Sequence, residues 1–181
     1  MQKSSKLNGI VIKRKNYGEA DKIVTLLTKE KGKIQTIAKG IRKIKSRKAP
    51  HLELFNQIST FVFKGRNFHI ITEVESKNTY PFLKKDLKRV VSAYKIVEQI
   101  DKLCPEEETY PQVYVLLVDT LEKLNEPECK IEYQLENFSG RLLKILGYLP
   151  VEENMPYKLL EAFIEKTIER KLKSKGLDYA I

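Results

Sequence analysis

The sequence predicts an α+β protein of two domains, a five-stranded antiparallel β-barrel followed by an all-α helical domain. Over residues 1–79, short segments alternate apolar and polar residues and are separated by turn residues, a pattern typical of strands. From Tyr80 onward the apolar spacing changes to about 3.6 residues, which indicates amphipathic helices. We therefore place the domain boundary between residues 79 and 80, giving domains of residues 1–79 and 80–181.

Five segments of the first domain are expected to form strands, namely residues 7–15, 22–28, 33–39, 52–64 and 68–75. Turn residues follow the first two strands, and residues 65–67 are expected to join the last two strands in a hairpin. An open sheet of five short strands would leave two edges to protect, so closure into a barrel is the more economical arrangement.

Four helices are expected in the second domain. The first begins at Pro81 and ends before Pro105, and the second begins at Pro111. The third runs from Pro127 to Gly147 and the fourth from residue 156 to residue 176. Because short polar loops connect them, the four helices are expected to pack as a bundle-like domain.

The positive charge of the protein belongs to the first domain. Residues 1–80 contain 18 lysines and arginines against 6 acids, a net charge of +12, whereas residues 81–181 carry a net charge of −2. A basic module joined to a nearly neutral one is the pattern expected when only the first module meets a polyanion.

The cations are densest in residues 39–50, KGIRKIKSRKAP, which contain six lysines or arginines and no acid. Successive cations of this kind can engage successive phosphates of a nucleic acid. The alternative is a loop that only aids solubility. The residues predicted to bind DNA are Lys13, Arg14, Lys15, Tyr17, Lys33, Lys39, Arg42, Lys43, Lys45, Arg47, Lys48 and Arg66. Tyr17, in a turn, is the candidate for stacking on bases, whereas Phe61, Phe63 and Phe68 have core packing as their default.

Chemistry other than binding has no support in the sequence. Phosphate-binding glycine loops and the common hydrolase motifs are absent, so we expect no catalytic residues. Cys104 and Cys129 are isolated, and residues 106–108, three adjacent glutamates, are interpreted as a solvated turn, so no metal and no cofactor are expected.

No apolar run approaches the ~20 residues that span a bilayer, and the charged first residues do not suit a signal peptide, so we expect a cytoplasmic protein.

Several short segments carry a resemblance to a known family. These are Gly18-Glu19-Ala20-Asp21, Thr28 to Gly32, Ala38-Lys39-Gly40-Ile41-Arg42 and, near the end, Arg141-Leu142-Leu143 with Leu146-Gly147-Tyr148. The stretch from residue 16 to 75 closely resembles the amino-terminal domain of the RecO family, bacterial recombination mediators of DNA repair. Many relatives carry a four-cysteine zinc element after the Leu-Gly-Tyr segment, and residues 146–163 contain no cysteine, so no zinc is expected.

The resemblance implies an OB-fold that binds single- and double-stranded DNA, fused to a helical domain that docks proteins. Family members anneal complementary strands, bind RecR, recognise the acidic carboxy-terminal tail of single-stranded-DNA-binding protein and help to load RecA. It also implies a cytoplasmic, nucleoid-associated bacterial protein with no membrane partner.

The docking residues expected in the helical domain are Lys84, Lys85, Lys88 and Arg89. The alternative is that these four cations form only the solvated face of the first helix. A rival function for the whole chain is an RNA- or ribosome-associated module, because a basic five-stranded barrel also suits RNA. An enzyme of nucleic-acid processing is the remaining alternative.

Overall fold

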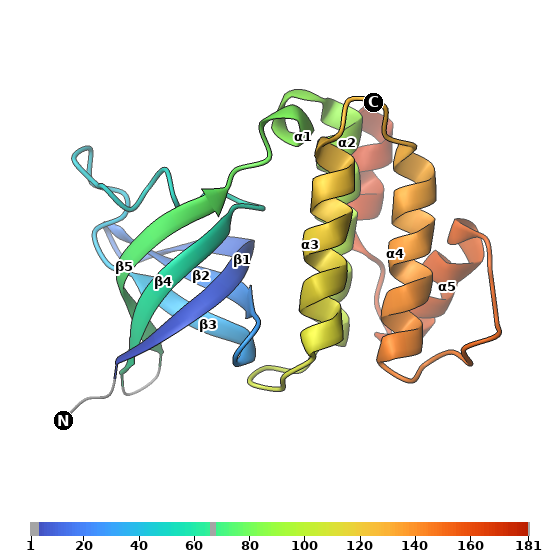
Figure 1. The fold of residues 1–181 in the computed structure, drawn as a ribbon, viewed down its shortest axis with the longest axis horizontal. Coiled ribbons are helices and arrows are strands. Elements are labelled where there is room, and N and C mark those ends of the chain that lie inside the picture. The colour runs from blue at the N-terminus through green and yellow to red at the C-terminus, as the bar shows by residue number, and fades with distance from the viewer. Residues whose placement is uncertain (1–3, 66–67, 181) are drawn as a thin grey trace. The chain divides into compact units, whose positions relative to one another are not determined.

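The computed structural model describes residues 4–65 and 68–180 (Figure 1). The chain forms two compact units. The barrel unit comprises Met1–Thr79 and Pro105–Tyr114, and the helical unit comprises Tyr80–Cys104 and Val115–Ile181. The predicted fold class, a five-stranded barrel followed by a helical region, is confirmed.

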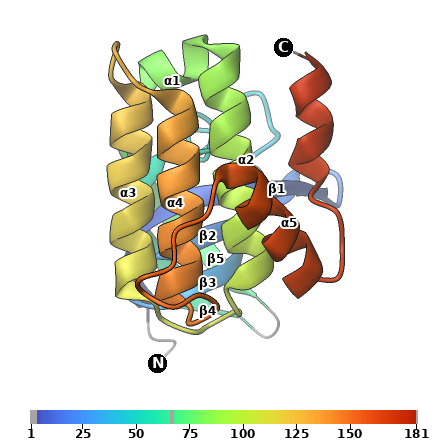
Figure 2. The same ribbon diagram turned by 90° about the vertical axis from the view of Figure 1, so that its right-hand side faces the viewer.

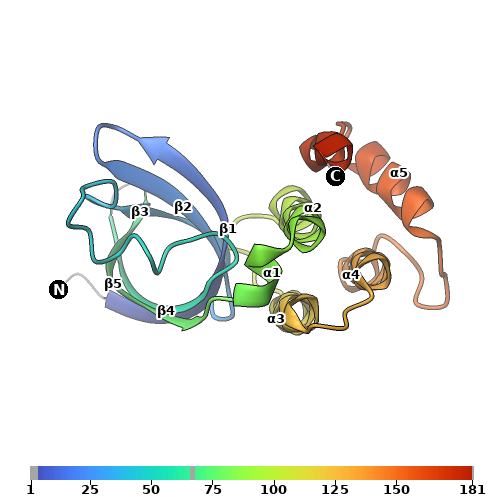
Figure 3. The same cartoon turned by 90° about the horizontal axis from the view of Figure 1, so that it is seen from above.

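The strands of the barrel are β1 (Ser4–Tyr17), β2 (Asp21–Thr28), β3 (Gly32–Ala38), β4 (Gln57–Lys64) and β5 (His69–Asn78). They close in the order β1-β2-β3-β5-β4, and Figure 3 shows them as a ring. The β3–β5 pair is parallel and the other pairs are antiparallel. β1 can pair with both β2 and β4 because it is 14 residues long and changes register between Val11 and Lys13. This closed five-stranded barrel is OB-fold-like, as expected.

The barrel interior is filled by aliphatic side chains from all five strands. Its core consists of Leu7, Val11, Val24, Leu26, Ile34, Ala38, Ile41, Leu52, Ile58, Val62 and Ile71. Two of these residues, Ile41 and Leu52, come from the connection between β3 and β4 rather than from a strand. That connection therefore closes one end of the barrel, across which it runs in Figure 3.

The segment Pro105–Tyr114 protects the barrel where β3 and β5 pair only briefly. The Glu107 N–H donates a hydrogen bond of 2.8 Å to the Lys33 carbonyl, and Lys33 also forms an isolated parallel bridge with Glu106. The Gln35 amide donates to the Glu106 carboxylate. These contacts cover backbone groups at the start of β3 that would otherwise form an exposed strand edge. We call residues 105–109 the strap.

The helices are α1 (Pro81–Lys85), α2 (Leu87–Leu103), α3 (Pro111–Asn125), α4 (Ile131–Ile145) and α5 (Tyr157–Thr167), followed by a 3-10 helix, η1 (Lys173–Ala180). Within the helical unit, α4 packs against α2 and α5, and η1 packs against α2 (Figure 2). Among the described residues, every helix is too short or too polar to cross a bilayer.

Three of the predicted helix boundaries are wrong. The first predicted helix is interrupted at Asp86, which has extended backbone and whose carboxylate accepts the Arg89 N–H at 3.1 Å, so that it caps a new helix, α2. The third begins at Ile131 rather than Pro127, because the chain before it forms a connection whose carbonyls bind Arg89. The fourth ends at Thr167. Apolar spacing continued across each break and concealed it.

The predicted strand over residues 52–64 begins only at Gln57, because residues 52–56 belong to the preceding connection. Phe55 has a φ of +70°, and its N–H donates to the Val11 carbonyl at 2.9 Å. The predicted hairpin turn at residues 65–67 lies partly outside the described residues.

Candidate nucleic-acid interface

The connection between β3 and β4, residues 39–56, contains the cationic stretch and is named here the basic loop. Three of its apolar side chains, Ile41, Leu52 and Phe55, are buried. Burying one large apolar side chain stabilises the folded state by roughly 1.5–3 kcal/mol. The two ends of the basic loop are therefore fixed on the barrel.

Residues 18–21, the turn between β1 and β2, hold the start of the basic loop. The Gly40 N–H donates to the Asp21 carboxylate at 2.7 Å, and the Arg42 N–H donates to the Ala20 carbonyl at 2.9 Å. The Arg42 guanidinium also donates to the Gly18 carbonyl at 3.3 Å. The turn and the loop thus form one continuous surface.

Two predicted DNA-binding cations hold the returning half of the basic loop. The Arg14 guanidinium donates to the Leu52 carbonyl at 3.2 Å and forms an ion pair of 2.6 Å with the Glu53 carboxylate. The Lys48 ammonium donates to the Ile71 carbonyl at 2.9 Å. Arg14 and Lys48 are therefore engaged with the protein itself and contribute to the order of the loop.

Between these anchors lies the loop tip, defined as residues 42–47. Its four cations, Arg42, Lys43, Lys45 and Arg47, are all exposed, and it contains no acid. Among the described residues, no carboxylate forms an ion pair with Lys43, Lys45 or Arg47. Among the described residues, the tip thus presents three positive charges without a carboxylate partner, and a fourth at Arg42, whose guanidinium is bonded to the Gly18 carbonyl.

The remaining predicted DNA-binding residues divide into three groups. Lys13, Lys15 and Lys39 are exposed. Lys33 lies under the strap with only 6% of its surface exposed, so it is not part of the cationic surface. Arg66 lies outside the described residues.

Tyr17 is 48% exposed and pairs with Phe68, for which core packing was the default expectation. Its ring centroid lies 6.3 Å from that of Phe68, with the planes tilted by 59°. Phe68 is half-buried and does not belong to the barrel core. Tyr17 directly precedes Gly18, whose carbonyl accepts a hydrogen bond from Arg42 of the basic loop. The aromatic pair therefore adjoins the start of this loop. The candidate interface therefore combines exposed cations with two rings.

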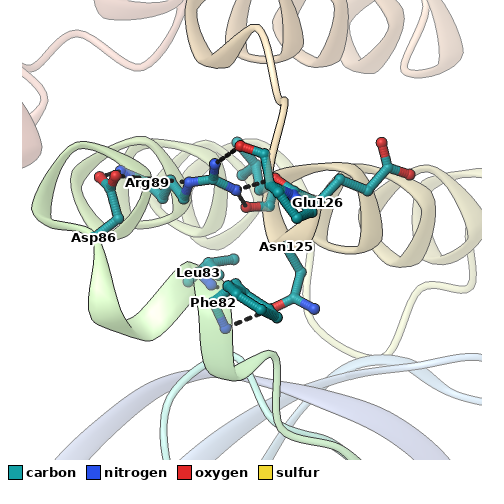
Figure 4. A network of polar contacts seen from close by, with 8 residues as sticks. Phe82, Leu83, Asp86, Arg89, Asn125 and Glu126 are labelled. Atoms are coloured by element: carbon teal, nitrogen blue, oxygen red, sulfur yellow. Dashed lines mark hydrogen bonds and ion pairs between the residues drawn. The ribbon is translucent and has the colours of Figure 1, made fainter.

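In the helical unit, Arg89 has a structural role (Figure 4). Arg89 is buried, with 8% of the residue exposed. Its guanidinium donates hydrogen bonds to the carbonyls of Leu124, Glu126 and Pro127, at 2.7 Å for Leu124 and 2.6 Å for Pro127. These carbonyls lie at and just beyond the end of α3, where helix carbonyls lack partners within the helix. Asp86 lies 3.7 Å from the same guanidinium. Arg89 is therefore not available for docking.

Lys88 differs from Arg89 because it is exposed and lines a groove of about 1060 Å³. The groove lies between α2, α4 and the segment entering α5, and the other cations that line it are Lys95, Lys130 and Lys158. Its floor contains apolar residues such as Val91, Ile131 and Leu135. Lys84 and Lys85 are exposed on α1 and do not line this groove.

One thiol also lines the groove. Burial raises the pKa of Cys129 above its ordinary value, so the thiol is less often the reactive thiolate near neutral pH. In the described residues, no group of three or more metal-ligating side chains is found. The groove is also lined by Glu132 and Glu136, so its charged lining is mixed and contains four lysines and two glutamates.

Two family models match the chain. The model for the Recombination protein O N terminal matches residues 1–80, and the model for the Recombination protein O C terminal matches residues 84–154.

Individual relatives agree with these matches. The chain is 36% identical to the DNA repair protein RecO of Symbiobacterium thermophilum over 144 residues, which cover 80% of this chain and 57% of the relative. It is 38% identical to the RecO of a Roseiflexus species over 141 residues, covering 78% and 49% of the two chains. The matched part thus amounts to about half to three-fifths of the length of these relatives.

Proposed function

The chain belongs to the RecO family of DNA repair proteins, and from that premise we propose that its barrel unit binds single- and double-stranded DNA and anneals complementary strands. The observation that supports this proposal most directly is the loop tip, whose four exposed cations are held out by an ordered loop. Phosphates attract such cations whatever the base sequence, so binding is expected to be independent of sequence.

Annealing by this mechanism needs charge neutralisation and no bond-making chemistry. Two complementary strands repel each other through their phosphates, and a cationic surface lowers that barrier by displacing counterions. Contacts to the phosphates leave the base edges free to pair. The anchors of the basic loop fix its ends on the barrel, so the tip meets DNA without first having to be ordered.

The annealing rate of dye-labelled complementary oligonucleotides tests the proposal. In the loop variant, Lys43, Lys45 and Arg47 are replaced by alanine. We expect annealing to slow by about tenfold, because electrostatic steering raises association rates by 10-fold or more. The control variant replaces Lys123, Lys166 and Lys171, three exposed cations of the helical unit, so its net charge falls equally. If both variants annealed at the same rate, the loop would have no local role.

For the helical unit we propose protein docking, with the cation-lined groove receiving the acidic carboxy-terminal tail of single-stranded-DNA-binding protein. The apolar floor and the lysines Lys88, Lys130 and Lys158 complement an acidic tail, although Glu132 and Glu136 lie in the same lining. Together with RecR, such docking would allow the protein to help load RecA where single-stranded-DNA-binding protein covers the strand.

Fluorescence anisotropy of a labelled acidic tail peptide tests the docking proposal. Replacing Lys88 and Lys130 by glutamate is expected to weaken peptide binding at least tenfold, because the acidic residues of the peptide would then meet two further negative charges in the groove. Replacing Lys84 and Lys85 by glutamate changes the net charge equally and is expected to have little effect. Equal losses in the two variants would contradict docking in the groove.

The RNA-binding alternative makes a different prediction for competition. Excess structured RNA at matched salt would displace a single-stranded oligonucleotide easily if the barrel unit were an RNA module. We expect single-stranded DNA to be the stronger competitor.

A further inference from the structure

Ile44 is an apolar residue in a position where the fold gives it nothing to pack against. Its side chain has a relative exposure of 105%, the largest among the exposed large apolar residues of the described chain. Its neighbours Lys43 and Lys45 are exposed lysines. A loop that served only to present charge would need no isoleucine between them.

Backbone hydrogen bonds of the loop tip hold the segment that contains Ile44. The Lys43 N–H donates to the Gly40 carbonyl at 3.1 Å, and the Ser46 N–H donates to the Lys43 carbonyl at 2.9 Å. Ile44 lies within the second of these turns. Its side chain is also β-branched and therefore has few rotamers to lose on binding.

We propose that Ile44 contacts the bases of single-stranded DNA while the adjacent cations contact its phosphates. This inference rests on the proposed function and specifies which form of DNA the loop tip prefers. In a single strand the faces of the bases are accessible to an apolar side chain, and isoleucine is among the residues that insert between base steps. In a duplex the base faces are covered by stacking, so the same contact requires unstacking.

Two observations favour bases over a lipid surface as the partner of Ile44. The tip carries only one large apolar residue, whereas membrane-binding segments bury a broad apolar face. The exposed Tyr17 ring, paired with Phe68, lies at the base of the same loop, linked through the Arg42 contact with Gly18. Rings of this kind stack on bases, so a strand that follows the loop meets base-binding groups at both ends of it.

The test compares Ile44→Ser with Ile44→Phe in the full chain, because neither substitution changes the charge. We expect Ile44→Ser to weaken binding of a single-stranded oligonucleotide roughly tenfold at every salt concentration, a loss within the range known for one base contact. The slope of log affinity against log salt stays unchanged because no cation is removed. Binding of a duplex of equal length changes less than twofold, and Ile44→Phe binds the single strand at least as tightly as the natural protein.

Two further readouts complete the test. A 2-aminopurine base in the oligonucleotide is expected to change fluorescence on binding the natural protein and to change less with Ile44→Ser. The inference is overturned if Ile44→Ser matches the natural protein on the single strand, or if it weakens single-strand and duplex binding equally. It is also overturned if the substitution reduces binding only to anionic lipid vesicles. Failure of the natural protein to bind any DNA would instead refute the proposed function.

Discussion

Gly32 shows how closely the strap packs on the barrel. This residue has a φ of +64°, and a Cβ at its position would lie 1.8 Å from the Glu108 carbonyl oxygen. We expect Gly32→Ala to lower the free energy of unfolding by about 2–4 kcal/mol, through left-handed strain of ~1–2 kcal/mol and displacement of the strap. Urea denaturation measures the loss.

Gly18→Ala is the matched control, because Gly18 has a φ of +54° and, in the described part of the chain, the added Cβ would have no other atom within 4 Å. It should therefore show the backbone strain alone, about 1–2 kcal/mol. Equal losses in the two variants would mean that the strap does not stabilise the barrel.

Arg89 provides the second prediction at this scale. Replacing it by methionine removes the donor to three carbonyls, two of which lie beyond the end of α3. We expect a loss of about 2–4 kcal/mol of stability, since buried acceptors without partners cost ~1–3 kcal/mol each and part of that cost is relieved by water. Lys88→Met, an exposed neighbour on α2, should be nearly neutral. Thermal unfolding followed by circular dichroism compares them, and similar midpoints would contradict the structural role of Arg89.

The roles of individual cations could not be predicted from the sequence. The partners of Arg14, Lys48 and Arg89 are carbonyls 38, 23 and 35 residues away. Only the folded chain brings these groups together, whereas Lys43 and Arg47 have the same local sequence character and remain exposed. The sequence therefore identifies the cationic stretch correctly as a surface feature but cannot divide it into anchors and tip.

At the scale of elements, the basic loop is an ordered cap with a projecting tip. Lys48→Met is expected to lower stability by about 1.5–3 kcal/mol, the usual contribution of a hydrogen bond from a charged group. Lys45→Met, in the exposed tip, is expected to leave stability unchanged within about 0.5 kcal/mol. The urea denaturation midpoints of the two single variants test this prediction. Equal midpoints would show that the Lys48 hydrogen bond does not contribute to stability.

Most elements were predictable because their apolar patterns are strong. The five strands and the barrel closure follow from period-two segments that bury Val24 and Leu26 on one face. Periodicity did not show the interruption at Asp86, where the carboxylate caps α2 by accepting the Arg89 N–H. It also did not show the late start of α4, because the carbonyls before α4 bind the distant Arg89 guanidinium. The return of the strap to β3 was equally invisible, because its bonds to Lys33 are made by the backbone.

At the scale of the whole molecule, charge and fold divide at nearly the same place. The net charge of +12 lies in residues 1–80, and the barrel unit contains residues 1–79 together with residues 105–114, which include three glutamates. The sequence shows where the excess of positive charge ends, but it does not show that residues 105–114 join the barrel unit. The cation-lined groove was not, because its lysines come from α2, the approach to α4 and the start of α5.

The salt dependence of DNA binding tests the central claim, that the loop tip holds the phosphate backbone, most directly. The affinity for a labelled single-stranded oligonucleotide is measured across a salt series for the natural protein and for the variant with alanine at Lys43, Lys45 and Arg47. We predict that the slope of log affinity against log salt becomes shallower by about 2, because each lost phosphate contact removes ~0.7. An unchanged slope in this variant would contradict the claim.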